Sequence, residues 1–123
     1  MSTAGIIALV FLGGGLGSVA RFSVGELSLK LYKGEFPLGT LLANLLACLI
    51  LGITVYMLKD RIGQAEWSRY FILIGFCGGF STFSTFSAET LKLFQEQFYL
   101  LGALNILISV LLGIGILMIF IRS

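Results

Sequence analysis

Long uncharged stretches separated by short polar segments dominate this chain. Four stretches contain no Asp, Glu, Lys or Arg: 1–20, 36–58, 70–88 and 97–121. A helix needs about 20 residues to cross a hydrocarbon core of about 30 Å, and these stretches lack the strict alternation of barrel strands. The pattern therefore predicts an all-α membrane protein with one domain, 1–123, and four transmembrane helices. The approximate spans are 4–30, 37–58, 69–96 and 98–121.

The composition excludes several other classes of protein. Apolar residues make up 58% of the chain and charged residues 11%, which a soluble fold of this length cannot enclose, so we expect a lipid bilayer around it. Eight basic and six acidic residues, scattered along the chain, predict no binding to nucleic acid. Histidine is absent and no pair of nucleophile and base can be assembled, so we expect no enzyme. Cys48 and Cys77 lie in uncharged stretches and are interpreted as packing residues.

The basic residues leave the orientation in the membrane weakly specified. With four spans, the side that holds both termini carries Lys59, Arg61, Arg69 and Arg122, and the other side carries Lys30, Lys33 and Lys92. Because the two sides carry nearly equal numbers of basic residues, the positive-inside rule predicts no strong preference for either orientation. Two interpretations stay open: one orientation wins modestly, or the chain inserts both ways and pairs with an inverted copy of itself.

Small and polar residues at helical spacing predict contact faces between the spans. Gly13 and Gly17 are four apart, and Asn44 has Thr40 and Cys48 four residues to either side. In the last span the stripe consists of Gly102, Asn105, Ser109 and Gly113. An amide exposed to lipid would leave donors and an acceptor unsatisfied, so Asn44 and Asn105 should face protein or water. A purely structural bond between helices remains an alternative for both.

The third span contains a predicted interruption near 78–82. Its sequence over 75–89 is GFCGGFSTFSTFSAE, where two glycines are followed by Ser and Thr residues that compete for backbone hydrogen bonds. Non-helical backbone inside a membrane is tolerated where protein or a cavity surrounds it, and its free carbonyls can coordinate a cation. After the interruption, Phe83 and Phe86 share a helix face and alternate with hydroxyls. Simple packing is the alternative for the two rings.

The polar groups within the spans favour an anion over a cation. The uncharged stretches contain no acidic side chain, and Glu26 and Glu89 lie at or beyond their ends. The available groups are hydrogen-bond donors and aromatic ring edges, which carry partial positive charge. They belong to Asn44, Asn105, Ser84, Thr85, Ser109, Phe83 and Phe86. These residues predict a narrow, uncharged anion pathway.

Three motifs resemble those of the small bacterial fluoride channels called Fluc or CrcB. They are GGGLGSVARF at 13–22, PLGTLLAN at 37–44 and, most specifically, the 75–89 segment. The resemblance covers nearly the whole chain. It implies two four-helix subunits in an antiparallel, dual-topology homodimer, with two fluoride pores and a structural Na+ ion at the dimer centre.

The resemblance also implies roles for individual residues. Gly78 and Ser81 would bind sodium through their backbone carbonyls, and Phe83 and Phe86 would turn ring edges toward fluoride. The other pathway residues would be Asn44, Ser84, Thr85 and Arg21, with Asn105 and Ser109 at positions that vary in the family. The implied activity is passive export of fluoride across the bacterial plasma (inner) membrane, without a nucleotide or redox cofactor.

Two other functions compete with this interpretation. A small proton-coupled multidrug transporter also has about four spans and often dual topology, but such exporters carry a membrane-embedded Glu in the first helix, and 1–20 contains no acid. A non-transporting membrane scaffold predicts that Asn44 and Phe83 are replaceable with effects on stability alone.

Overall fold

The computed structural model describes residues 1–59 and 66–121, and it confirms the all-α prediction. Its elements are α1 (Thr3–Leu31), α2 (Leu38–Leu58), α3 (Glu66–Ser68), the π-helix η1 (Arg69–Cys77), α4 (Gly78–Phe80), α5 (Phe83–Gln95) and α6 (Tyr99–Phe120). Within the described ranges there is no β-strand. Four helical segments are long and apolar enough to cross a membrane: 3–31, 38–58, 66–95 and 99–120.

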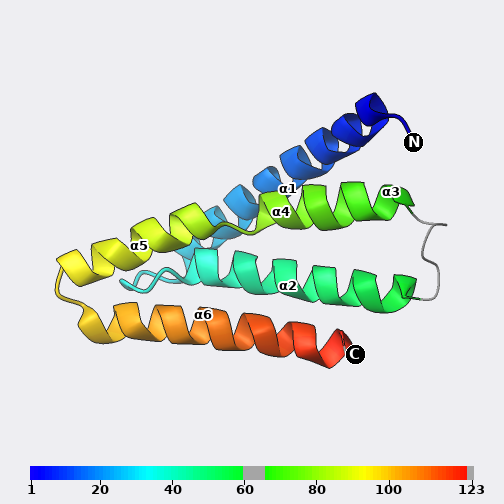
Figure 1. The fold of residues 1–123 in the computed structure, drawn as a ribbon. Helices are drawn as coiled ribbons and strands as arrows, with labels where there is room; N and C mark the ends of the chain where they lie inside the picture. Colours follow the sequence, from blue (N-terminus) through cyan, green and yellow to red (C-terminus); the bar gives the residue numbers. More distant parts are fainter. Residues whose placement is uncertain (60–65, 122–123) are drawn as a thin grey trace.

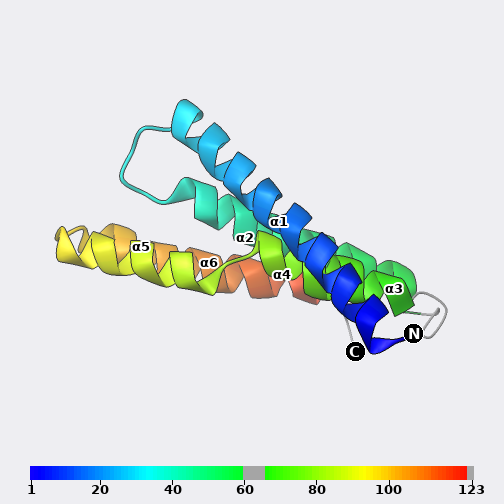
Figure 2. The ribbon, with the colours of Figure 1, turned by 90° about the horizontal axis from the view of Figure 1, so that it is seen from above.

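The four segments form an elongated bundle. Figure 1 shows α2 side by side with α6, and α2 also contacts α1 and η1. Figure 2 shows α1 crossing obliquely over η1 and α4, which are the elements that it contacts most extensively. Both ends of the described chain lie at the same end of the bundle (Figure 1), as an even number of crossings requires. Arg61 and Arg122, which entered the charge count, lie outside the described residues.

Glycines let α1 approach the third segment backbone to backbone. A methyl group on Gly13 would overlap the carbonyl oxygen of Phe71, and one on Gly17 would overlap that of Phe76. The Cα of Gly13 would also lie 3.0 Å from a Cβ built on Gly75. Hydrophobic force between helices is absent in lipid, so close van der Waals packing of small residues holds the two segments together. The predicted contact face at Gly13 and Gly17 is confirmed.

The buried core of a single chain is small. Ala43, Ala47 and Phe80 form its centre, with Ala20, Val24, Ile50 and Phe76 packed around them. Most large apolar side chains of α1 and α6 are instead exposed on the outside of the bundle, including Phe11, Leu16, Leu111 and Ile119. An apolar exterior of this kind is stable only against lipid or another apolar surface.

The third segment is interrupted at Ser81 and Thr82, as predicted. Ser81 has φ −82° and ψ 158°, and Thr82 has φ −153° and ψ 123°, so both residues are extended between α4 and α5. The Thr82 side chain caps α5, because its Oγ1 accepts a hydrogen bond of 3.1 Å from the backbone N–H of Thr85. The helix therefore restarts immediately after the interruption.

Candidate functional site

The side-chain amide of Asn44 holds the extended backbone at Thr82. The Thr82 N–H donates to Asn44 Oδ1 at 2.7 Å, and Asn44 Nδ2 donates to the Thr82 carbonyl at 3.3 Å. A backbone N–H and C=O that leave a helix inside a membrane need partners, because water is excluded there. Asn44 on α2 supplies the acceptor for the N–H and a further donor to the carbonyl, which as the N-cap carbonyl also accepts the first bond of α5. One hydrogen of its NH2 group is left for another acceptor.

The interruption releases several carbonyls from their helical hydrogen bonds. In a continuous helix the Thr82 N–H would bind the Gly78 carbonyl and the Thr85 N–H would bind that of Ser81. Here Thr82 donates to Asn44, and Thr85 donates to Thr82 Oγ1. The carbonyls of Gly78 and Ser81, the two residues expected to bind sodium, are thus freed from those bonds.

Arg21 donates a hydrogen bond to another of the released carbonyls, that of Gly79. Its Nε donates to the Gly79 oxygen at 3.2 Å, from α1 to α4. Gly79 would otherwise pair with the N–H of Phe83 on the far side of the interruption. Arg21 therefore supports the same segment that Asn44 holds from α2.

A groove beside the interruption collects several of the predicted pathway residues. It has a volume of about 290 Å³, and its lining comprises Asn44, Cys48, Ser81, Thr82, Phe83, Phe86, Ser109 and Val110. The Phe83 and Phe86 rings lie 6.1 Å apart between centroids and are tilted by 40°. Phe83 is 79% exposed, so the groove of one chain is open on this side. We call it the phenylalanine groove below.

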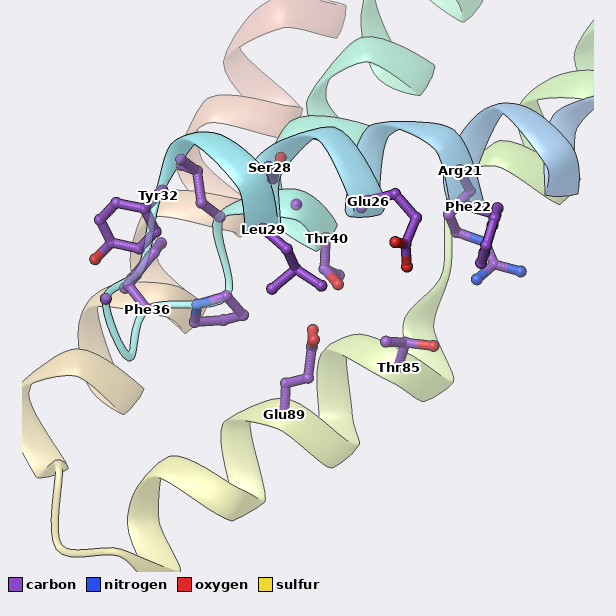
Figure 3. Close-up of a pocket in the computed structure, with 15 residues that line it drawn as sticks. Arg21, Phe22, Glu26, Ser28, Leu29, Tyr32, Phe36, Thr40, Thr85 and Glu89 are labelled. Carbon is purple, nitrogen blue, oxygen red and sulfur yellow. The ribbon is translucent and has the colours of Figure 1, made fainter.

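A second cavity lies between α1, the start of α2 and α5. Its volume is about 260 Å³, and Arg21, Glu26, Thr40, Thr85 and Glu89 are among its lining residues. Figure 3 shows the carboxylates of Glu26 and Glu89 directed into the space between α1 and α5. Glu89 Oε1 is buried and has no hydrogen-bond partner in the part of the chain that the structure describes. The predicted pathway residues are thus divided, because Arg21 and Thr85 line this cavity and not the phenylalanine groove.

Two predicted pathway residues line neither hollow. Ser84 is exposed, and its hydroxyl lies 3.3 Å from Thr82 Oγ1. Asn105 is 1% exposed and donates from Nδ2 to Thr90 Oγ1 at 2.9 Å. Asn105 therefore makes the bond between helices that sequence reasoning left open, whereas Ser109, one turn later on α6, reaches the groove.

Sequence reasoning missed two residues that organise this region. Thr82 caps α5 and exchanges two hydrogen bonds with the Asn44 amide, and Thr90 joins α5 to α6 through Asn105. The spacing of Thr82 and Thr85 behind a glycine pair was a signal for a helix N-cap. The pairing of Thr90 with Asn105 had no local signal, because it depends on how α5 and α6 pack.

Oxygen atoms are the ligands that this region offers to a metal ion. Among the residues that the structure describes, no group of three or more His, Cys, Asp or Glu side chains is arranged to hold one. Cys48 and Cys77 are both free thiols. A smaller cavity of about 170 Å³ is lined by both cysteines and by Gly78 and Ser81, whose carbonyls are released at the interruption.

Comparison with known protein families identifies the chain's relatives. Residues 8–121 match the family model described as CrcB-like protein, Camphor Resistance (CrcB). The chain belongs to the CrcB family. The match includes α2, the interruption and α5, together with all the residues of the phenylalanine groove.

Three curated relatives of the chain carry the same name. A protein from Coxiella burnetii (strain CbuK_Q154), named fluoride-specific ion channel FluC, is 43% identical over 110 residues, which cover 89% of each chain. Proteins with the same name from Pyrococcus furiosus and Dehalococcoides mccartyi (strain CBDB1) are 47% and 42% identical. These two alignments cover 85% and 97% of this chain, and 84% and 90% of the respective relatives.

Proposed function

We propose that this chain forms a fluoride-selective channel that lets fluoride leave the cytoplasm passively. The observation that carries the proposal is the phenylalanine groove, where Asn44, Phe83, Phe86 and Ser109 meet at the interruption of the third segment. The names of the relatives support fluoride as the ion. Transport through such a groove needs no nucleophile and no general base, so we propose no enzymatic activity.

The chemistry of the groove suits an anion that has lost most of its water. Its lining contains no Asp, Glu, Lys or Arg. The remaining N–H of Asn44 and the positive edges of the two rings are short-range, neutral partners for a small anion. A full positive charge at this position would bind the anion tightly and slow its exit, whereas neutral dipoles allow entry and release.

We further propose that two copies assemble antiparallel as a homodimer. In one chain the groove is open and Phe83 is 79% exposed, so a second wall is required to enclose a pathway. The exposed apolar side chains of α1 and α6 leave ample surface for contact with another copy or with lipid. The near-even distribution of Lys and Arg is what insertion in both directions requires.

A sodium ion is proposed to bridge the two copies at the carbonyls of Gly78 and Ser81. The donor set fits such a cation, because hard cations prefer oxygen ligands and both carbonyls are released from helical bonds at the interruption. A bound cation would supply positive charge that holds four backbone oxygens of two chains together. Asn44 holds the extended backbone at Thr82, and Arg21 binds the Gly79 carbonyl just before it.

Fluoride release from liposomes tests the proposed function. Purified protein is reconstituted into vesicles loaded with potassium fluoride, a potassium ionophore balances the charge, and a fluoride electrode records release. We expect rapid release of fluoride and little release of chloride from matched vesicles. Release no faster than from protein-free vesicles, with the dimer verified by crosslinking, would refute the proposal.

Proton dependence separates the channel from a proton-coupled transporter. A passive channel releases fluoride at the same initial rate whether or not a pH gradient is imposed at constant voltage. A rate that follows the proton gradient would favour coupled transport. The acidic residue of α1, Glu26, lies outside the uncharged stretch 1–20 and does not line the phenylalanine groove.

A further inference from the structure

Three polar side chains connect the core between α5 and α6 to the phenylalanine groove. The Thr90 hydroxyl lies 2.7 Å from the Phe86 carbonyl oxygen, and Asn105 Nδ2 lies 2.9 Å from Thr90 Oγ1. Asn105 Oδ1 lies 3.4 Å from the Ser109 hydroxyl. Thr90 and Asn105 are 6% and 1% exposed, whereas Ser109 lines the groove.

The hydrogens of this network have one consistent arrangement. A carbonyl oxygen can only accept, so the single hydroxyl hydrogen of Thr90 is donated to Phe86. Thr90 Oγ1 can then only accept from Asn105, which requires that the NH2 group of the amide face Thr90. The amide oxygen consequently faces Ser109 and accepts its hydroxyl hydrogen. The Ser109 hydrogen is therefore directed toward Asn105, which does not line the groove.

This arrangement determines what Ser109 offers to an anion. With its hydrogen donated to Asn105, Ser109 presents oxygen lone pairs to the groove, and these repel an anion. To bind fluoride, the hydroxyl must rotate and leave Asn105 Oδ1 without a donor at a site that is closed to water. An anion at Ser109 is thus bound only at the expense of a buried hydrogen bond.

We infer that Asn105 is a positioning residue that retains the Ser109 hydroxyl hydrogen and thereby weakens fluoride binding in the groove. This inference rests on the proposed fluoride channel. It adds a reason why fluoride leaves the groove quickly, since fast conduction needs sites that an ion leaves easily. Sequence reasoning placed Asn105 and Ser109 on one pathway and left a structural bond between helices open for Asn105. The structure instead assigns contact with the ion to Ser109 and control of its hydrogen to Asn105.

The dependence of flux on fluoride concentration tests this role. In Asn105→Leu the amide oxygen is gone, so the Ser109 hydroxyl can donate into the groove. We expect the half-saturating fluoride concentration for release to fall, on the order of threefold to tenfold for one added hydrogen bond. The maximal rate should fall as well, because the ion leaves more slowly.

Thr90→Val provides a second variant with little change in volume. Without the Thr90 hydroxyl, the amide of Asn105 is free to turn its donors toward Ser109, whose own hydrogen then faces the groove. We expect a smaller shift of the half-saturating concentration than in Asn105→Leu, in the same direction, because a valine at position 90 favours neither orientation of the Asn105 amide. If Asn105→Leu does not assemble, Thr90→Val provides the test.

Ser109→Ala is the matched background for both variants. There, neither Asn105→Leu nor Thr90→Val should lower the half-saturating concentration further. A shift that persists without the Ser109 hydroxyl would overturn the inference. The inference would also be overturned if Asn105→Leu and Thr90→Val lost stability and flux while the half-saturating concentration stayed at the wild-type value. That result would show that the bond between Asn105 and Thr90 is purely structural. These outcomes apply where wild-type vesicles release fluoride; absence of release from the wild type overturns the proposed function itself.

Discussion

Asn44 and Thr82 are 38 positions apart in the chain, yet the side-chain amide of Asn44 replaces the helical hydrogen bond of the Thr82 N–H. The Thr82 N–H donates to Asn44 Oδ1 at 2.7 Å, and Asn44 Nδ2 donates to the Thr82 oxygen at 3.3 Å. This exchange keeps the interruption of the third segment extended. It also holds α2 against the residues that precede Phe83. The conformation of the interruption and the shape of the phenylalanine groove therefore both depend on the Asn44 amide.

Asn44→Leu should destabilise the fold and abolish most of the fluoride flux. The Thr82 N–H would be left buried without an acceptor, which costs about 1–3 kcal/mol. Thermal unfolding in detergent measures the first effect, and release from liposomes measures the second. Asn44→Asp is the matched control for the acceptor, because it retains an oxygen for the Thr82 N–H. We expect it to unfold closer to the wild type while its negative charge still blocks fluoride, and equal flux in Asn44→Asp and wild type would contradict the proposed pathway.

Phe83→Ile and Phe86→Ile should each reduce fluoride release by about tenfold or more, because an aliphatic side chain has no positive ring edge to offer the anion. The dimer, measured by crosslinking, should persist in both variants. Phe11→Ile provides a control, because this ring on α1 is 77% exposed and lines none of the three hollows described. Wild-type flux in both groove variants would show that these rings only pack.

Gly17→Ala should destabilise the bundle where α1 crosses the third segment. The added methyl group would overlap the backbone carbonyl of Phe76, and relieving such overpacking typically costs about 1–3 kcal/mol. Gly15→Ala on the same helix has nothing within 4 Å of the new methyl group and should unfold at nearly the wild-type temperature. Equal unfolding temperatures for the two variants would argue against the close backbone approach.

Replacing sodium with a large organic cation should weaken the dimer or reduce conduction. The proposed ligands are the backbone carbonyls of Gly78 and Ser81, so Ser81→Ala should retain the dependence on sodium. This variant removes only the Ser81 hydroxyl, which donates to the Cys77 carbonyl at 2.8 Å. Crosslinking and fluoride release are measured in sodium and in N-methylglucamine. Identical results in both solutions would rule out a sodium ion between the copies.

Much of the fold was predictable, because it depends on short segments of sequence. Uncharged stretches gave the four helices, and the glycine pair with the Ser and Thr residues after it gave the interruption. The division of the predicted site was not predictable. Thr85 follows Phe83 by two residues, yet it lines a different cavity, because successive residues of a helix point in different directions and only packing shows what each one faces.

The sequence by itself determined that the chain lies in a membrane, that it forms four long apolar helical segments, and that the third of them is broken. These properties follow from hydropathy and backbone preference, which each residue carries with it. Only the tertiary structure decided that Asn44 binds the backbone at Thr82, and that Asn105 faces Thr90 and not the groove. Such partners depend on the rotation and crossing of whole helices, which backbone contacts at Gly13 and Gly17 help to set and which no single segment contains.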